Sequence, residues 1–587
     1  MINSSSFASC LAAVVWLVLP AASQTPRHSS PGGYVGSKVC GACHSRIYST
    51  YLKTGMGQST VPGRDPKLVE GLPAPFSLFD QDSGQFFEVI RKEGKLYQSQ
   101  YAVDHDGKET FRQTWPLDYV IGSGENGYGF AIWRNGYLFE APLTYYSKSK
   151  IWGLSPGYEV HNYAFTRPIL ARCVGCHSGR PRPLAGRTGA YRDPPFKETA
   201  IGCENCHGPG ARHVAERQRG EPASGGGSIV NPARLKGRLA DDICIKCHQG
   251  GDVRVVQPGK QESDFRPGMP LDRVLAIFKA PLKRDSPPQS VLLEHYFGMT
   301  LSKCYRASAG RLRCITCHDP HVQRSAKEAA DYYRARCLQC HVESACKIPA
   351  EKRLHGSKGD ACTACHMPKR TVTTITHAAL TDHSIAARPG EPYPEDAFET
   401  HAAEGTGLLH LTAEPGSSTP GLSPITLLEA YIGLVREGHK EYADKRDALL
   451  QKLSRDAPDQ PAVLIALARK AASRTDTASA ETAIAYLTRV VQTGVAAPED
   501  YLLLSELHGR RNRHIDAIRM LELGSASNPY FREFDEQIAV HQIAMGKYGD
   551  ARKTIRNGLA LFPDDHLLRM LEQKVNAAML DDPAPRP

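Results

Sequence analysis

The sequence has no hydrophobic run long enough to cross a membrane after its first residues. Its longest apolar run covers residues 10–22, which is shorter than the ~20 residues that a membrane-spanning helix needs. The chain also lacks a strong excess of one charge, because 72 basic and 62 acidic side chains leave a net charge of +10. We therefore expect no membrane span in the mature protein and no binding of nucleic acid.

Lysine and arginine are absent before Leu11, so the amino terminus is the only positive charge ahead of the apolar run. The run still has the length of a signal-peptide core, and Ala21 and Ser23 occupy the small-residue positions before a cleavage point. We predict a signal peptide over residues 1–23 and an exported protein, periplasmic or extracellular. An uncleaved membrane anchor is the alternative.

Cysteine is absent from the C-terminal third of the chain but abundant before it. Of the 17 cysteines, fourteen form seven pairs with the spacing Cys-x-x-Cys, and histidine follows each pair at once. The seven motifs are Cys40/Cys43/His44, Cys173/Cys176/His177, Cys203/Cys206/His207, Cys244/Cys247/His248, Cys314/Cys317/His318, Cys337/Cys340/His341 and Cys362/Cys365/His366. This pentapeptide is typical of c-type haem attachment.

The spacing of the motif has a chemical reason. Cysteines three residues apart on a tight helical turn can reach the two vinyl groups of one porphyrin, and the next residue, histidine, then lies under the iron as proximal ligand. Zinc sites and a disulfide framework are the alternatives, and neither explains a histidine after every pair. We predict seven covalent haem c groups, held by the fourteen cysteines and the seven motif histidines.

Seven proximal histidines leave the opposite face of each iron to be filled. Eleven other histidines lie between Gln24 and Pro420, so the supply permits two axial ligands at every iron. The candidate distal ligands are His213, His321, His355, His161, His383, His377 and His295. For any one of them, the alternative is a surface histidine or one that pairs with a haem propionate.

Residues 24–385 are predicted to form one haem-packed, mainly α-helical domain. Short connections separate the motifs after the second, so the haems should pack closely and form an electron path. A β-rich insertion is expected over about residues 76–160, where aromatic and polar residues alternate between turn dipeptides such as Asn135-Gly136. Its expected role is structural cover or a docking face.

Two further cysteines, Cys304 and Cys346, flank the fifth and sixth motifs. In an exported protein, the favoured interpretation is a disulfide between them. A free thiol and a thiolate near an iron are the alternatives.

The rest of the chain has the pattern of another domain. Residues 386–422 are rich in Pro, Gly, Ser and Thr and are predicted to be a linker. Pro529 and Pro563 lie 34 residues apart, which is the period of tetratricopeptide repeats. We predict an α-solenoid of such repeats over residues 423–576 and a tail over 577–587. Its surface could dock a protein partner or support the haem domain.

The motifs carry a family resemblance. Residues 40–383 resemble exported multihaem cytochromes of the cytochrome c-552/4 type, through Cys-x-x-Cys-His-Gly-Pro-Gly-x-x-His at 203–213. The stretch 314–383 is similar to cytochromes with doubled Cys-x-x-Cys-His motifs, and tetratricopeptide tails occur fused to such proteins. The resemblance implies haem c, electron transfer and distal ligation by His213 and His321.

The favoured function is electron transfer along the haems to a redox protein partner that docks on the repeats, with no catalytic residue. The alternative is a multihaem oxidoreductase that acts on a small nitrogen or sulfur compound at one open iron. No Cys-x-x-Cys-Lys motif occurs, so the lysine-ligated haem of ammonia-forming nitrite reductases is not supported. A haem-bearing scaffold that organises partners is a third hypothesis.

Overall fold

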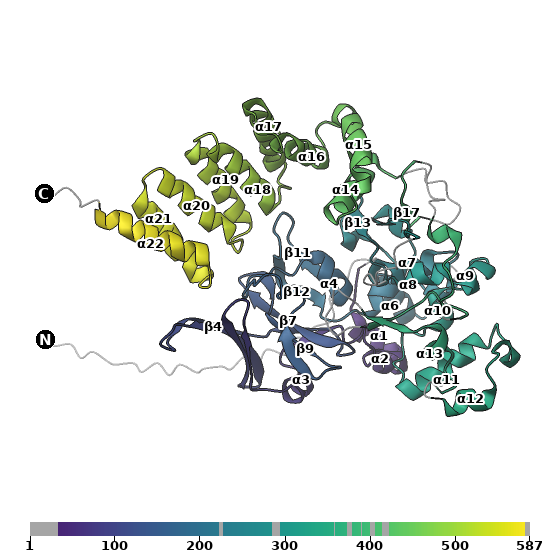
Figure 1. Cartoon of the computed structure of the whole chain (residues 1–587). Coiled ribbons are helices and arrows are strands. Elements are labelled where there is room, and N and C mark those ends of the chain that lie inside the picture. The colour runs from purple at the N-terminus through teal and green to yellow at the C-terminus, as the bar shows by residue number, and fades with distance from the viewer. Residues whose placement is uncertain are drawn as a thin grey trace, which may run out of the picture.

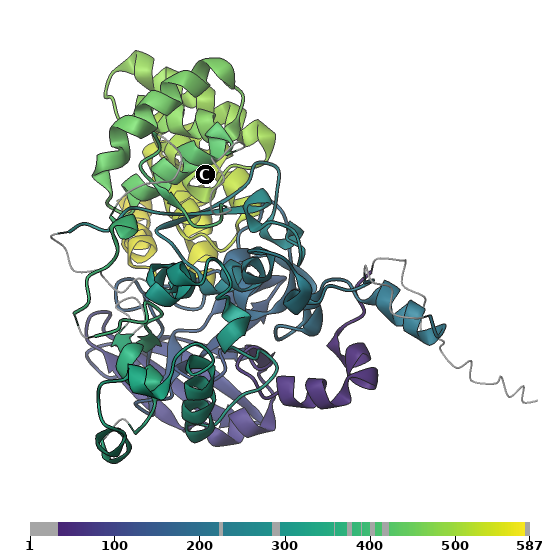
Figure 2. The same ribbon diagram turned by 90° about the vertical axis from the view of Figure 1, so that its right-hand side faces the viewer.

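The computed structural model describes residues 33–221, 227–284, 294–356, 359–371, 379–388, 390–398, 405–413 and 422–581. The predicted signal peptide and His377 lie outside these residues. Figure 1 shows a β-rich region, a group of short helices beside it, and an arc of longer helices that ends near the C-terminus. Figure 2 shows the arc above the rest of the chain, with the purple helices α1 and α2 below it.

Two antiparallel sheets form the β-rich region. The first contains, in order, β2 (Phe76–Asp80), β3 (Gln85–Lys92), β4 (Lys95–Val103) and β5 (Glu109–Pro116). The second contains β1 (Thr60–Pro62), β6 (Tyr119–Ile121), β7 (Gly127–Arg134), β9 (Leu143–Tyr146) and β10 (Ile151–Leu154), with β8 (Tyr137–Glu140) paired to β7. Asn135 has a φ of 51° and Gly136 a φ of 83°, the backbone that the tight β7–β8 turn requires.

Apolar side chains from both sheets share one core. The buried members include Phe87, Val89 and Leu96 from the first sheet and Phe130, Ile132 and Trp152 from the second. Alternating strand residues supply most of these side chains. The β-rich region therefore has a hydrophobic core of its own.

Most of the Cys-x-x-Cys-His motifs lie on short helices. These helices are α1 (Ser37–Cys43), α4 (Ala171–His177), α5 (Cys203–His207), α7 (Leu239–His248), α10 (Cys314–Cys317) and α13 (Cys362–His366), while the sixth motif begins at the last residue of α11 (Ala326–Cys337). Residues three apart on a helix lie on one face. Each of the six motifs on a helix therefore presents both thiols on the same side.

Further short elements connect the motif helices. The helices are α2 (Ser45–Tyr51), α3 (Pro66–Gly71), α6 (Ala211–Gln218), α8 (His295–Leu301), α9 (Lys303–Ala307) and α12 (Ala350–His355). The strands are β11 (Gly179–Pro183) with β12 (Tyr191–Glu198), β13 (Val253–Val256) with β14 (Leu275–Lys279) and β17 (Leu409–His410), and β15 (Lys369–Thr371) with β16 (Ala379–Thr381).

The C-terminal part consists of helix pairs, which confirms the predicted helical repeats in their coarse form. The helices are α14 (Pro424–Arg436), α15 (Ala443–Asp456), α16 (Pro461–Ala472), α17 (Thr477–Thr493), α18 (Pro498–Gly509), α19 (His514–Ser527), α20 (Glu533–Ala544), α21 (Tyr548–Leu561) and α22 (His566–Asp581). Ala517, Ala539 and Ala551 are fully buried. Small residues at these positions let neighbouring helices approach closely.

The repeats contact the rest of the chain at both ends of the arc (Figure 1). At one end, the α14 residue Gly433 packs so tightly that an added Cβ would lie 2.6 Å from the Val253 side chain. At the other end, Gln113 donates a hydrogen bond of 3.4 Å to the carbonyl oxygen of Leu561 in α21. Between α19 and α20, the Tyr530 ring lies 4.7 Å from the Phe139 ring, and its hydroxyl accepts a hydrogen bond of 2.9 Å from Asn135. These contacts give the repeats a supporting role in the fold.

The described part of the predicted linker is packed rather than extended. Strand β17 joins the sheet of β13 and β14, and Leu408 and Leu411 on either side of it are buried. The reason is local, because two leucines flank the strand within a stretch that is otherwise rich in Pro and Gly. Among the described residues, no helix is both long and apolar enough to span a membrane.

Candidate haem-binding sites

Four motif histidines each face a second histidine from another part of the chain. The ring centres lie 6.4 Å apart for His44 and His213, 6.0 Å for His207 and His321, 5.7 Å for His248 and His295, and 6.2 Å for His318 and His383. All four partners are among the distal ligands predicted from the sequence.

This separation fits two axial ligands of one iron. An imidazole nitrogen binds a metal at about 2.0–2.1 Å, so two imidazoles on opposite sides of an iron have ring centres about 6 Å apart. Each pair also lies beside the two thiols of its motif, which are the groups that attach haem c. The donor set therefore fits haem c at the first, third, fourth and fifth motifs.

Hydrogen bonds orient several motif imidazoles for this role. His207 Nδ1 lies 2.8 Å from the Val230 carbonyl oxygen, and His366 Nδ1 lies 2.8 Å from that of Ala386. A carbonyl can only accept, so Nδ1 carries the proton and Nε2 keeps its lone pair. Such partners fix the ring and leave Nε2 as the metal ligand.

Burial favours the neutral form of several facing imidazoles. Burial first, and neighbouring imidazoles second, lower the pKa of His248 and that of His383 to about 4. A neutral imidazole is the form that binds a metal. Burial also lowers the pKa of His177, although its side chain remains accessible to solvent. These histidines are thus free of competing protons at neutral pH.

The motif cysteines contact one another between motifs. A hydrogen bond with Cys203 raises the pKa of Cys40, and one with Cys247 raises the pKa of Cys176. A hydrogen bond with Cys244 likewise raises the pKa of Cys314. The first motif thus contacts the third, the second contacts the fourth, and the fourth contacts the fifth.

Further contacts complete the series. Burial and then the nearby Cys244 thiol raise the pKa of Cys206 to about 12, so the third motif adjoins the fourth. Burial and then Cys362 raise the pKa of Cys337, so the sixth adjoins the seventh. Burial and then Cys304 and Cys340 raise the pKa of Cys317, which places the fifth motif beside the sixth. The seven motifs form one connected group.

Two facing histidines also touch each other. The His295 and His383 rings lie 4.5 Å apart and nearly perpendicular, with an angle of 89° between their planes. His295 faces the fourth motif and His383 faces the fifth. The ligands of two neighbouring sites are therefore in direct contact.

A buried carboxylate that the sequence analysis missed positions the first pair. Glu204, only 1% exposed, accepts hydrogen bonds of 2.8 Å from Gly36 N and 2.7 Å from Gly210 N. Gly36 precedes the helix of the first motif, and Gly210 precedes the helix of His213. One side chain thus fixes both halves of the pair. Its signal was the acidic residue inside the third motif.

A second missed carboxylate links the fourth and fifth motifs. Asp241, in the first turn of α7, accepts a hydrogen bond of 3.0 Å from the Cys314 backbone N–H. Burial raises its pKa. Asp241 precedes the fourth motif, as Glu204 lies within the third, so acidic residues beside motifs are the shared signal.

Of the other distal candidates, the two that the structure describes, His161 and His355, do not face a motif imidazole. His161 is exposed, with its ring 4.4 Å from that of Tyr163. His355 is exposed at the end of α12, and His377 lies outside the described residues. In the part of the chain that the structure describes, the motif histidines without a facing imidazole are His177, His341 and His366.

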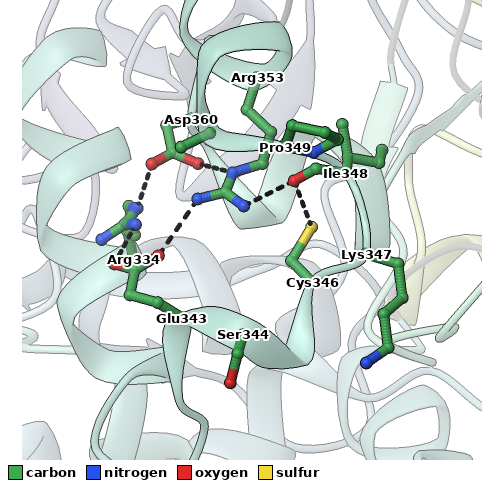
Figure 3. Close-up of a pocket in the computed structure, with 10 residues that line it drawn as sticks. Arg334, Glu343, Ser344, Cys346, Lys347, Ile348, Pro349, Arg353 and Asp360 are labelled. Carbon is green, nitrogen blue, oxygen red and sulfur yellow. Dashed lines mark hydrogen bonds and ion pairs between the residues drawn. The ribbon is translucent and has the colours of Figure 1, made fainter.

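The predicted Cys304–Cys346 disulfide is absent, which corrects that expectation. Both thiols are free, and Cys304 Sγ lies 4.0 Å from His341 Nε2. Figure 3 shows Cys346 in a different setting, pointing at the Ile348 carbonyl oxygen. Arg353 donates to the same oxygen over 2.8 Å and pairs with Asp360 over 2.6 Å. An ion-paired surface loop therefore holds Cys346 away from Cys304.

His321→Ala should open one iron at the third motif. His321 is the imidazole that faces His207, so its loss leaves one axial position without a protein ligand. The reduction potential of the third haem should then shift, because axial ligation controls it. The expected result is one high-spin haem per molecule in the electron paramagnetic resonance spectrum. His105→Ala is the control, because His105 is exposed on the β-rich region. Unchanged low-spin signals in His321→Ala would contradict the assignment.

Comparison with known proteins finds weak homology. The chain is 22% identical over 382 residues to the dissimilatory sulfite reductase MccA of Wolinella succinogenes, a match that covers 58% of this chain and 51% of the relative. The chain thus matches about half the length of that curated relative. No model of a protein family matches, so membership of the cytochrome c-552/4 type stays a prediction.

Solved structures give two further similarities. The outer cell wall cytochrome OcwA is 15% identical and aligns with 84% of this chain and 99% of its own, with a TM-score of 0.38. A tetratricopeptide domain of Arabidopsis OM64 is 12% identical and covers 20% of this chain and 94% of its own, with a TM-score of 0.18. The homology to MccA supports a redox role, and the motifs support covalently bound haem c as the group that serves it.

Proposed function

We propose that the protein is an exported cytochrome with seven covalent haem c groups that conducts electrons between redox partners. The observation that carries the proposal is the connected group of seven motifs, four of which have paired imidazoles with ring centres 5.7 to 6.4 Å apart. Bound haem supplies reversible one-electron chemistry at its iron. The protein supplies attachment, axial ligands and close spacing.

Closed coordination suits a conductor better than a catalyst. Two imidazoles that bound one iron would leave no position for a substrate. Contacts between adjacent motifs, such as Cys40 with Cys203 and Cys244 with Cys314, keep neighbouring haems close. Short separations of this kind are what an electron path needs.

The repeats are proposed to dock a protein partner in addition to supporting the fold. Tetratricopeptide-like helix pairs stack into extended surfaces of the kind that bind proteins. Tyr530 and Gly433 occupy the contacts with the rest of the chain. A partner would therefore bind elsewhere on the arc.

The mature protein should carry seven haems in its intact mass, because every motif has two thiols and a histidine. Mass spectrometry under denaturing conditions counts them, since covalent haem survives denaturation. Low-spin signals that do not change with cyanide are expected from the four haems at the motifs with paired imidazoles. A mass with six or fewer haems, in exported protein whose motif cysteines are otherwise intact, would contradict the predicted number of seven.

A second candidate function is reduction of a small sulfur compound at the second motif. Two observations favour it: the relative is a dissimilatory sulfite reductase, and His177 has no facing imidazole among the described residues. An iron with one protein ligand could bind sulfite. One stoichiometric high-spin haem that binds cyanide, together with sulfite-dependent oxidation of a reduced dye, would favour this candidate over the conductor.

A further inference from the structure

The sixth motif differs from the four paired motifs in what it faces. Opposite the His341 imidazole lies a thiol rather than a second imidazole, with Cys304 Sγ 4.0 Å from His341 Nε2. Cys304 lies in helix α9, whose start is fixed by the buried Ser302 side chain, which accepts a hydrogen bond of 3.1 Å from Tyr305 N. The folded structure therefore holds the Cys304 thiol close to the His341 imidazole.

The distance fits two ligands of one metal. A nitrogen ligand lies about 2.0–2.1 Å and a thiolate sulfur about 2.3 Å from a metal, so the two atoms are about 4.3 Å apart when they lie on opposite sides. The observed 4.0 Å is close to that value. The imidazole atom that contacts the thiol is Nε2, the nitrogen that His207 and His366 also leave free.

We propose that Cys304 is the distal ligand of the sixth haem and binds its iron as a thiolate opposite His341. The proposal rests on haem attachment at the sixth motif, which belongs to the proposed function. On binding, the thiol releases its proton to water and the sulfur donates an electron pair to the iron. No electron is transferred in this step.

The positions of the two cysteines outside the motifs separate their roles. Cys304 is partly buried, and its thiol lies beside the imidazole of the sixth motif. Coordination to a metal cation deprotonates a thiol outright. Cys346, the other cysteine outside the motifs of the described chain, is exposed and contacts the Ile348 carbonyl oxygen instead.

Thiolate ligation would give the sixth haem distinct properties. A negatively charged sulfur stabilises ferric iron, so the reduction potential of this haem should lie below those of the imidazole pairs. The sixth motif adjoins the fifth and the seventh through Cys317 and Cys337. A haem of lower reduction potential at the sixth motif would create a drop in potential along the electron path, between the fifth and the seventh haem.

The test uses the full-length, exported and haem-loaded protein. Cys304→Ser and Cys304→His are compared with Cys346→Ser as the matched control. Intact mass is measured first, because a missing sixth haem would contradict haem attachment, which belongs to the proposed function, rather than ligation by Cys304. Low-temperature electron paramagnetic resonance and the sulfur-to-iron charge-transfer absorption then report the ligand.

The wild type should show one low-spin signal of the thiolate type and a charge-transfer band, and Cys346→Ser should keep both. Cys304→Ser should lose both and gain one high-spin haem, whereas Cys304→His should stay low-spin, without the band and with a raised potential. Identical spectra in wild type and Cys304→Ser, at full haem content, would overturn the proposal. So would a Cys304–Cys346 disulfide found by mass mapping of the unreduced protein.

Discussion

Replacing Cys244 and Cys247 with serine should remove one haem and divide the remaining six into separate groups. The fourth motif is the junction of the series, because Cys247 contacts Cys176 of the second motif and Cys244 contacts Cys314 of the fifth. Cys244 also adjoins Cys206 of the third motif. Without the fourth haem, the second should be isolated, and the first and third should stay joined to the fifth, sixth and seventh only through the segment of His321, which faces the third motif and follows the fifth.

Intact mass should show the loss of one haem, and laser-flash reduction should show slower electron redistribution between the two ends. The control is the double replacement of Cys362 and Cys365 with serine. The seventh motif lies at one end of the series and adjoins the sixth through Cys337. That variant should also lose one haem but keep redistribution among the other six. Equal electron redistribution in both variants would contradict the assignment of the fourth motif as the junction of the series.

Lys279→Met should destabilise the protein strongly and disturb the ligand of that same junction haem. Lys279, with a 5% exposed side chain, lies 2.8 Å from Glu294 and 3.3 Å from Asp252. Burial alone would lower its pKa, but these two carboxylates outweigh burial and raise it. Removing one partner of a buried ion pair costs about 3–5 kcal/mol, because the remaining charge is left uncompensated.

The effect on the haem follows from the position of Glu294. It precedes His295 at the start of α8, and His295 faces His248. Lys279 is therefore a positioning residue, and its loss should broaden or convert the low-spin signal of the fourth haem. Denaturant titration measures the stability, and electron paramagnetic resonance measures the ligand.

Lys283→Met provides the control for the stability measurement. Lys283 pairs with Glu441 over 3.2 Å, but both side chains are exposed, so its loss should cost under about 1 kcal/mol. Equal stability of the two variants would show that the Lys279 cluster does not support the fold. A destabilised Lys279→Met with wild-type spectra would refute its positioning role.

The local parts of the structure could be predicted from the sequence. Cysteine spacing predicts a helical turn at each motif, and most motifs lie on short helices such as α5 and α7. The Asn135-Gly136 dipeptide predicts a tight hairpin, and Pro529 and Pro563 indicate the repeat period; both features depend on neighbouring residues. Such features can be predicted because they depend on residues that lie close together in the sequence.

The long-range parts could not be predicted. The sequence named His213 and His383 as ligands but not the motifs that they face, because each pair joins segments far apart in the chain. The disulfide expectation failed for the same reason, since two spare cysteines do not reveal their separation in space. Strand β17 was hidden in a stretch of linker-like composition, where only its pairing with β14 defines it.

Each facing histidine lies on the C-terminal side of its motif, at separations that run from His248–His295 to His44–His213. An iron that joins such a pair closes a long loop of chain, and a closed loop restricts the unfolded chain as a disulfide does. The cysteines of the described residues are all free of disulfides. Iron–imidazole bonds would thus serve as the crosslinks of this protein. Thiol reductants would leave them intact, whereas acid or a competing soluble imidazole would open them.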